Sequence, residues 1–467
     1  MTASPRYPRL AGAGDREFLN VIAAETGLGV SAEPFPQQSV ARLVAERYGL
    51  SGQLTRIPTE KDDTFALSTN TGKFLVKVSP PGESLDIVNL QTAAMLHIRD
   101  RAPGLPVQVP VAAADGAFEC PVSAPGDAAR ALRVLTYLPG QLLSRAQPSA
   151  RQVRSIGSML ARLSIALRDF AHPRQDRLLI WDLQRFHRLR PLLDYVEDEA
   201  NAALAARIFD QFDDQVRPLL PALTRQVVHS DFSPYNLLVD DSTPGYVKGV
   251  IDFGDVVRTA VVFDVAVGMA NLLGTGPGNP WAVPLQFLDG YLAVRAVERR
   301  ELAVLAVSAQ ARLLLRALMA QWRAVEDPAR RDYLLSHSEQ DWARLARVQE
   351  DPDREATARI AALGDQHRPA PRDRAEDRAE GGQLRWPAHP NPARRLRPAR
   401  PLRLPRRPWS TGSTRPARGT SRSGPASRSN GAKGYWARLT GCSTGHPWRS
   451  SAGRACTCMT RTGASTW

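Results

Sequence analysis

Cysteine is scarce in this sequence of 467 residues, with only Cys120, Cys442, Cys456 and Cys458. So few thiols, three of them near one end, exclude a disulfide-stabilised scaffold. The sequence also lacks an apolar run long enough to span a membrane, and Met1–Arg16 contains no apolar segment of the secretory type. We therefore expect a soluble cytoplasmic protein with no membrane partner.

Bulky apolar residues and acidic residues become rare after about residue 366. Residues 366–467 contain no Val, Ile or Phe and carry 21 Lys and Arg against 4 Asp and Glu. Since the formal net charge of the whole chain is +14, residues 1–365 are close to neutral. This balance excludes a uniformly basic nucleic-acid-binding protein for the body of the chain. The body is long enough to bury the core of an enzyme.

Two differently patterned regions make up this body, and together they predict an α+β fold of two lobes. Residues 49–138 carry a small sheet domain, in which the polar turn Asn70-Thr-Gly72 closes a hairpin. Its predicted strands are 64–69, 73–79, 106–113 and 130–137, with a helix over 85–99. Before it, residues 1–48 predict a leader with one helix, 39–48, that stops at Gly49.

The second region, residues 139–350, is mostly helical in pattern. Helical spacing extends over 150–170, 199–216 and 284–348. Between these stretches lie two short apolar strands, 226–229 and 248–252, each with polar residues at its end. The chemistry of the chain is therefore expected where these two strands end.

The strongest functional signal follows those strands. The first leads into His229, then Asp231, then Asn236 five residues later, and the second leads into Asp252-Phe-Gly-Asp255. Carboxylate and amide oxygens at neighbouring strand ends suit a hard cation and a proton acceptor. Asp and Asn also populate ordinary turns, but their joint spacing is that of the catalytic and metal-binding loops of kinases.

A second signal is Lys77, which lies in the apolar strand Phe74-Leu-Val-Lys-Val78. A lysine on the inward face of a strand is costly unless it meets an anion. An edge-strand lysine whose amine reaches solvent is the plainer interpretation. Together with the downstream motif, Lys77 instead indicates a contact with nucleotide phosphates.

With these residues in place, residues 30–350 resemble the aminoglycoside phosphotransferase and choline kinase superfamily of protein-kinase-like small-molecule kinases. Within it, the hydroxylysine kinase branch is the nearest likeness. The motif residues are His229, Asp231, Asn236 and Asp252, with Asp255 and Asp264 in the flanking pattern. Glu60-Lys-Asp62-Asp-Thr-Phe65 is similar to the phosphate-side loop of the branch, Leu135-Thr-Tyr-Leu-Pro-Gly140 to its hinge, and Trp181-Asp182-Leu183 to another of its segments.

The resemblance implies a role for each residue. Asp231 accepts the proton of a substrate hydroxyl, and His229 braces the same loop. Asn236 and Asp252 hold Mg²⁺ against the phosphates of ATP, which Lys77 also contacts, while Asp255 and Asp264 support the loops. The backbone of Thr136, Tyr137 and Leu138 holds adenine. Positioning and charge neutralisation of this kind suffice for phosphoryl transfer.

Substrate choice and the partner of Lys77 are less clearly encoded. The resemblance implies a small amino alcohol of the hydroxylysine type, with choline, homoserine and aminoglycosides open. Asp182, Glu197 and Asp198 are candidates to face a substrate amine, although the last two fit a solvated helix face and Asp264 fits a helix N-cap. No helix glutamate pairs obviously with Lys77, which leaves a catalytically silent binding protein as an alternative.

Residues 366–467 are predicted to be disordered, because they offer too little apolar surface to offset the entropy of ordering. One interpretation is a basic arm for nucleic acid. We favour an out-of-frame remnant, since shifted codons of Cys456–Trp467 permit a string that resembles the opening segment of class III pyridoxal-phosphate aminotransferases.

Overall fold

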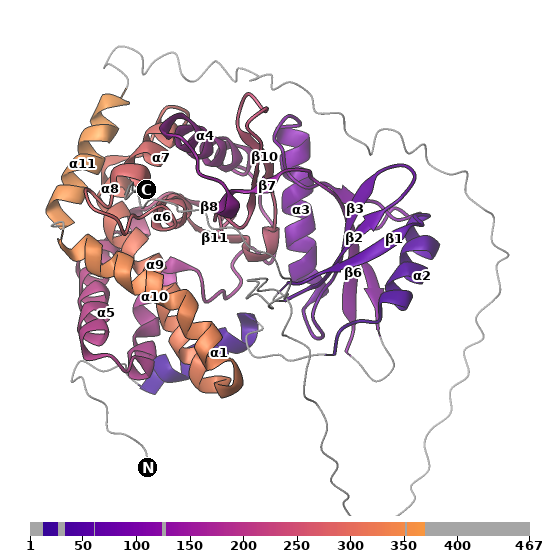
Figure 1. The fold of residues 1–467 in the computed structure, drawn as a ribbon, viewed down its shortest axis with the longest axis horizontal. Coiled ribbons are helices and arrows are strands. Elements are labelled where there is room, and N and C mark those ends of the chain that lie inside the picture. The colour runs from indigo at the N-terminus through magenta and orange to yellow at the C-terminus, as the bar shows by residue number, and fades with distance from the viewer. Residues whose placement is uncertain (1–12, 27–32, 60, 124–127, 351–352, 369–467) are drawn as a thin grey trace, which may run out of the picture. The chain divides into compact units, whose positions relative to one another are not determined.

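The computed structural model describes residues 13–26, 33–59, 61–123, 128–350 and 353–368. Within these ranges the chain forms helices and antiparallel sheets (Figure 1), in agreement with the predicted α+β class. Glu60 and residues 369–467 lie outside the described residues, and so does nearly all of the segment for which disorder and an out-of-frame origin were predicted.

The small lobe is built on a six-stranded sheet. Five strands follow the order β1-β2-β3-β6-β4, and β5 pairs with β6. The strands are β1 (Gln53–Ile57), β2 (Asp63–Ser68), β3 (Lys73–Val78), β4 (Pro110–Val111), β5 (Cys120–Val122) and β6 (Arg130–Thr136). The predicted hairpin is β2-β3, with Thr64 opposite Lys77 in its register. The strand that carries Lys77 was thus predicted from the sequence pattern of this hairpin.

Helices cover this sheet and explain why β6 is buried along its whole length. The predicted helix over 85–99 is α3 (Leu85–Arg101), which lies against β4 and β6 (Figure 1). Helix α2 (Gln37–Tyr48) places Val40 and Val44 in the core of the small lobe. It ends at Gly49, whose φ of 64° is easily adopted only without a Cβ, as the sequence predicted.

The N-terminal segment differs from the single-helix leader that was expected. It contains an additional helix, α1 (Ala13–Thr26), whose Phe18, Leu19 and Ile22 belong to the core of the large lobe. Helix α2 belongs to the core of the small lobe instead. The two helices of this segment therefore pack in different cores.

The large lobe is mainly helical, as predicted. Its helices are α4 (Ala150–Ala166), α5 (Glu199–Gln211), α6 (Val261–Ala270), α7 (Ala282–Leu292), α8 (Arg299–Ala303), α9 (Leu305–Glu326), α10 (Arg331–Glu350) and α11 (Asp353–Gln366), with 3₁₀ turns in η2 (Leu183–Tyr195). The stretch 284–348 is thus divided rather than continuous. One break falls at Pro328, which has no N–H to continue a helical ladder.

Two small sheets in this lobe hold the loops that carry the motif. One has the order β10-β9-β7 and the other pairs β11 with β8. Their strands are β7 (Gln141–Leu142), β8 (Arg225–Val228), β9 (Leu237–Val239), β10 (Val247–Val250) and β11 (Val257–Ala260). The two predicted strands are β8 and β10. Because each sheet joins a strand before one loop to a strand after the other, the two loops lie side by side.

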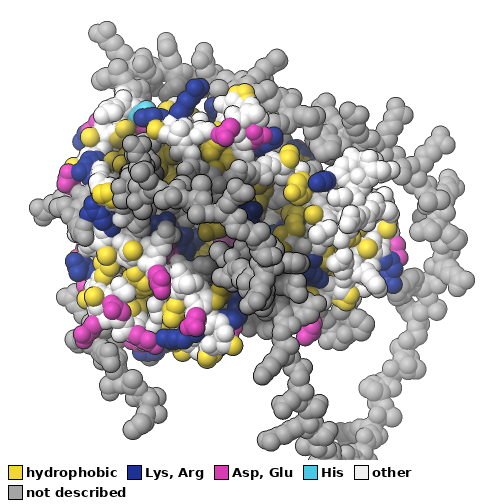
Figure 2. All heavy atoms as spheres, viewed as in Figure 1, with side chains coloured by type: hydrophobic (Ala, Val, Ile, Leu, Met, Phe, Trp, Pro, Cys, Tyr) yellow, Lys and Arg dark blue, Asp and Glu magenta, His cyan; other side chains and the backbone are white. Residues whose placement is uncertain are grey.

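The surface of the described residues carries both signs of charge. On the face in Figure 2, acidic and basic side chains are interspersed over the helices of the large lobe. In the part of the chain that the structure describes, no helix is both long and apolar enough to cross a bilayer.

Glycines let α4 and α7 approach closely, and this contact supplies a stability test. A Cβ on Gly157 would lie 1.9 Å from the carbonyl oxygen of Phe287, so the helices must separate if it is added. We expect Gly157→Ala to lower the free energy of unfolding by about 1–3 kcal/mol, measured by urea denaturation. Gly276→Ala, where no atom lies within 4 Å of the new Cβ, is the control. Equal destabilisation by both variants would contradict the close contact.

Candidate active site

Asp231 and Asn236 occupy one loop between β8 and β9 and are bonded to each other. The side-chain Nδ2 of Asn236 donates to the Asp231 carboxylate oxygen Oδ2 at 2.6 Å and to the Asp231 carbonyl at 3.0 Å. The five-residue spacing predicted from the sequence therefore closes a compact loop. It holds the Asp231 carboxylate in one orientation, with 29% of its side chain exposed.

A buried carboxylate stabilises the turn of this loop. Ser230 has a φ of 66°, a left-handed conformation that is uncommon for a residue with a Cβ. Asp264 accepts hydrogen bonds from the backbone N–H groups of His229 (3.2 Å) and Ser230 (2.9 Å). Asp264 lies in the first turn of α6, whose N-cap is Ala260, so its interpretation as an N-cap was wrong. Burial raises the pKa of Asp264, and the hydrogen bonds from the backbone N–H groups of Ser230 and His229 partly oppose this effect.

His229 connects the two functional loops from within the core. Its Nδ1 accepts the backbone N–H of Asp231 at 3.3 Å, which leaves Nε2 to donate to the carbonyl of Ile251 at 3.1 Å. The ring is fully buried and packs edge-on against Phe253, with centroids 4.9 Å apart. The ring of His229 thus contacts both loops through its two nitrogens.

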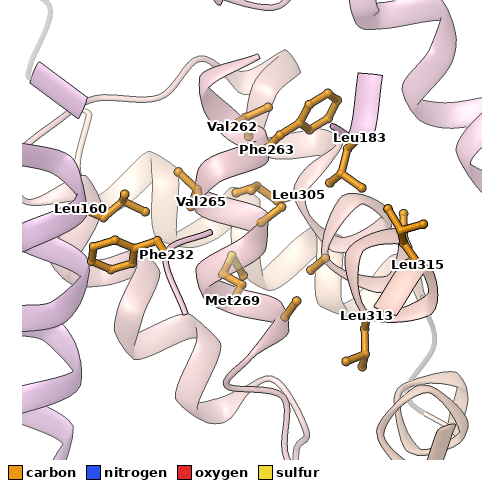
Figure 3. Packing of buried hydrophobic residues seen from close by; sticks show 14 of the residues in the cluster. Leu160, Leu183, Phe232, Val262, Phe263, Val265, Met269, Leu305, Leu313 and Leu315 are labelled. Carbon is orange, nitrogen blue, oxygen red and sulfur yellow. The ribbon is translucent and has the colours of Figure 1, made fainter. Parts of the chain in front are cut away.

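Buried aromatic residues beside the motif hold the loop on the helical core. Phe232 follows Asp231 directly and is only 2% exposed. Figure 3 shows it among the buried side chains of α4 and α6, with Leu160 and Val265 labelled. Because Phe232 is held in this packing, the neighbouring Asp231 has little freedom to move.

The loop after β10 presents Asp252 toward the small lobe. Asp252 also has a left-handed backbone, with φ 61°, and its Oδ1 accepts the N–H of Gly254 at 3.1 Å. The side chain remains 48% exposed, and its Oδ1 lies 3.5 Å from Nζ of Lys77. The Lys77 ammonium lowers the pKa of Asp252 against the opposing effect of burial. Asp252 is therefore an ionised carboxylate that a ligand can reach.

Lys77 is held between two carboxylates. Its Nζ lies 2.7 Å from Asp62 in addition to the contact with Asp252. Burial favours the neutral amine, but the Asp252 and Asp62 carboxylates outweigh it, so the pKa of Lys77 is raised. The buried ammonium that the sequence predicted is thus charged and faces the loops of the motif.

Asp62 is the partner of Lys77 that the sequence analysis did not assign. It comes from the segment before β2 rather than from helix α3. Gln91, near the middle of α3, accepts from Arg133 and donates to the Gly254 carbonyl at 3.5 Å. Glu83, which precedes α3, pairs with Lys61 at 2.8 Å. The carboxylate expected on the helix is therefore supplied by the phosphate-side loop.

Asn236 and Asp252 offer the oxygen atoms that a hard divalent cation requires. Both side-chain hydrogen bonds of Asn236 use Nδ2, which leaves its amide oxygen as an acceptor. No group of three or more His, Cys, Asp or Glu side chains within the described ranges could hold a metal by itself. A cation bound here would need further ligands, such as phosphate oxygens and water, as Mg²⁺ in nucleotide sites does. The donor set therefore fits Mg²⁺.

The segment that follows β6 offers fewer contacts for adenine than the sequence suggested. The backbone N–H of Thr136 donates to the Val109 carbonyl at 2.9 Å, and its hydroxyl accepts from the Val109 N–H at 2.9 Å. The N–H of Thr136 is therefore already used. Tyr137 and Leu138 follow the last residue of β6, and Tyr137 is 37% exposed. Their backbone groups remain the candidates for holding a base.

Sequence reasoning missed Arg312, which comes from α9 and contacts Asp231. Its Nη2 donates to Asp231 Oδ1 at 3.1 Å. Burial raises the pKa of Asp231, while the Arg312 guanidinium opposes that rise. The available signal was the pair of arginines, Arg312 and Arg316, within the leucine- and alanine-rich stretch 305–318, where a buried charge requires a partner.

Asp255 and Asp182 have different environments. Burial raises the pKa of Asp255, as does nearby Asp231, and its carboxylate lies 4.0 Å from Arg177. Asp182, considered as a contact for a substrate amine, is only 1% exposed and accepts from the Thr259 hydroxyl at 2.6 Å. It caps η2, so it does not face an open site.

Comparison with known proteins agrees with this geometry. Residues 53–305 match the family described as APH, phosphotransferase enzyme family. Hydroxylysine kinase of Danio rerio is 26% identical over 327 residues, which cover 67% of this chain and 90% of that protein. Homoserine kinase of Neisseria meningitidis serogroup B is 27% identical over 244 residues, or 52% of this chain and 73% of that protein.

A solved structure shares the fold. Amicoumacin kinase hAmiN, in complex with AMP-PNP, Ca²⁺ and Ami, aligns with a TM-score of 0.52 at 16% identity and covers 66% of this chain and 94% of that chain. This likeness supports the two-lobed kinase-like architecture. The family match includes β3, the loop of Asp231 and the loop of Asp252. The chain thus belongs to the phosphotransferase enzyme family and is a small-molecule phosphotransferase that acts on hydroxyl groups.

Proposed function

We propose that this protein transfers the terminal phosphoryl group of ATP, with Mg²⁺, to the hydroxyl group of a small hydroxylysine-like amino alcohol. The observation that carries the proposal is the convergence of the Asp231–Asn236 pair and the Asp252–Lys77 pair at the ends of neighbouring strands. One loop offers a proton acceptor and the other an ionised carboxylate beside a buried ammonium.

Each residue would act on a different part of the reaction. Asp231, fixed by Asn236 and Arg312, would accept the proton as the acceptor oxygen attacks. Mg²⁺ held by Asn236 and Asp252 would neutralise charge on the phosphate oxygens. Lys77, kept charged by Asp62, would bind a phosphate oxygen from the side of the small lobe. His229, Asp255 and Asp264 would act as supporting residues that hold the loops.

The same geometry weakens the alternative of a catalytically silent binding protein. That alternative was based on the missing helix glutamate. Because Asp62 takes the place of this glutamate at 2.7 Å from Lys77, the ammonium is oriented without it. We also propose that 49–138 and 139–350 are the two lobes. Helix α11 extends the second lobe, since Ile360 is buried in the larger core.

Hydroxylysine is the first acceptor to test because kinases of that name are similar to this chain over most of their length. Homoserine follows, since homoserine kinases also match. The complex of amicoumacin kinase hAmiN with AMP-PNP and Ca²⁺ supports ATP as the co-substrate and a divalent cation as the cofactor. The test is ADP release with Mg²⁺ and ATP over hydroxylysine, homoserine, choline and an aminoglycoside. If the protein binds ATP but phosphorylates none of these acceptors, the proposal is contradicted.

Residues 369–467 are expected to be dispensable for the kinase reaction. Deletion should begin at residue 369, because Asp365 forms an ion pair with Arg299 and His367 forms a hydrogen bond with Asp289 in the large lobe. We predict that a chain ending at Arg368 keeps its kcat and its acceptor KM within about twofold. Steady-state kinetics on both chains measures this. Loss of activity on deletion would instead assign a function to the basic segment.

A further inference from the structure

One donor of Arg312 is left without a partner beside the proposed base. Nη2 of Arg312 bonds to Asp231 at 3.1 Å, and the guanidinium lies 4.9 Å from the ring centroid of Trp181. Its side chain is only 10% exposed. Nη1 is buried and has no hydrogen-bond partner within the described residues. An unmet buried donor on a charged group is destabilising, so its presence needs a reason.

The neighbouring arginines of α9 and α10 have hydrogen-bond acceptors of their own. Arg316, one turn further along α9, donates to Asp341 through Nε at 2.6 Å and to Asn271 at 2.7 Å. Arg344 shares the same Asp341 at 3.4 Å. The carboxylate of Asp341 thus serves two guanidinium groups.

Asp231 is the carboxylate that Arg312 contacts, and Asp255 also interacts with Arg312 electrostatically. Asp255, the remaining acid near Asp231, lies 4.0 Å from Arg177. Arg312 therefore depends on Asp231, the group that would receive the substrate proton.

We propose that Nη1 of Arg312 binds the carboxylate of the acceptor, with Arg316 adding positive potential. The inference rests on the proposed function and narrows it. The acceptor would be a hydroxy amino acid rather than choline, an aminoglycoside or a simple amino alcohol, because those compounds lack a carboxylate. A guanidinium donates to carboxylates through two neighbouring nitrogens. Arg312 would thereby place the hydroxyl of the acceptor beside Asp231.

Matched acceptor pairs test the wild-type enzyme. Hydroxylysine is compared with 1,5-diaminopentan-2-ol, and homoserine with 3-aminopropan-1-ol, so that each pair differs only in the carboxylate. We expect kcat/KM to favour the acid by at least about tenfold in one pair, since an unpaired buried donor rejects an analogue that lacks its partner. Equal kcat/KM values within both pairs would overturn this inference and leave the kinase assignment standing.

Variants separate carboxylate binding from the positioning of Asp231. In Arg312→Gln, we expect the preference for the acid to fall to within about threefold, and Arg312→Lys should retain part of it because the charge remains. If Arg312 only positions Asp231, Arg312→Gln would lower kcat/KM equally for both members of a pair and keep their ratio. That result would contradict the inference. Arg323→Gln, at the far end of α9, is the control and should keep the wild-type ratio.

A binding measurement distinguishes failure of the inference from failure of the proposed function. Calorimetry with AMP-PNP and Mg²⁺ gives the Kd of each acceptor without turnover. We expect the wild-type protein to bind the acid member more tightly, and Arg312→Gln to weaken that binding about tenfold or more. This result supports the carboxylate contact. Absence of turnover on every acceptor, despite this binding, would contradict the proposed kinase reaction alone. Equal Kd values within both pairs would contradict the carboxylate contact.

Discussion

Asp231→Asn is expected to reduce kcat by about 10²–10⁴, the range that general-base catalysis contributes, with the Kd for ATP unchanged. The amide cannot accept the proton of the acceptor hydroxyl. It retains an oxygen that can accept from Arg312, which would otherwise be a buried cation without a partner. Asp231→Ala should lose a similar amount of activity and should also be less stable for this reason.

Single-turnover kinetics and ATP calorimetry on the same preparations measure this prediction. Asp240→Asn is a suitable control, because Asp240 is also a half-buried aspartate of the large lobe but pairs with Lys248 and is not part of the proposed site. The control should keep its turnover. Wild-type turnover in Asp231→Asn would remove Asp231 from the chemistry, whereas loss of ATP binding would indicate a structural role.

Asp252→Asn is predicted to have the second largest effect, on the dependence of activity on Mg²⁺. The substitution removes the negative charge from the proposed metal site and leaves Lys77 with only Asp62 as a carboxylate partner. We expect the Mg²⁺ concentration for half-maximal rate to rise at least about tenfold and kcat to fall by about 10² or more, because electrostatic stabilisation of the transferred group is lost.

A titration of rate against free Mg²⁺ at saturating ATP distinguishes metal binding from phosphate binding. Asp62→Asn is the contrasting variant, since Asp62 contacts Lys77 and not the proposed cation. We expect it to raise the KM for ATP and to leave the Mg²⁺ midpoint within about twofold of wild type. Identical Mg²⁺ midpoints in Asp252→Asn and wild type would exclude Asp252 as a metal ligand.

Much of the fold and the centre of the site could be predicted because the signals are local. The β2-β3 hairpin follows from a turn between two short strands, and α2 from helical spacing that ends at Gly49. The pairing of Asp231 with Asn236 depends on a spacing of five residues within one loop. Such contacts form between residues close in sequence, so that the pattern itself constrains them.

The parts that could not be predicted depend on contacts between distant segments. Arg312 reaches Asp231 from a helix 81 residues further along the chain. Asp62 approaches Lys77 across the β2-β3 pair, whereas the family pattern directed attention to α3. Strand β9 has three residues, too few to show a period.

Crystallography of the protein with AMP-PNP and Mn²⁺, using the anomalous signal of manganese, tests the central claim most directly. The account predicts one metal peak bonded to the amide oxygen of Asn236 and to the carboxylate of Asp252, with Lys77 contacting a phosphate oxygen and Asp231 facing the terminal phosphoryl group. Metal bound to the phosphates with Asn236 and Asp252 both turned away would contradict it.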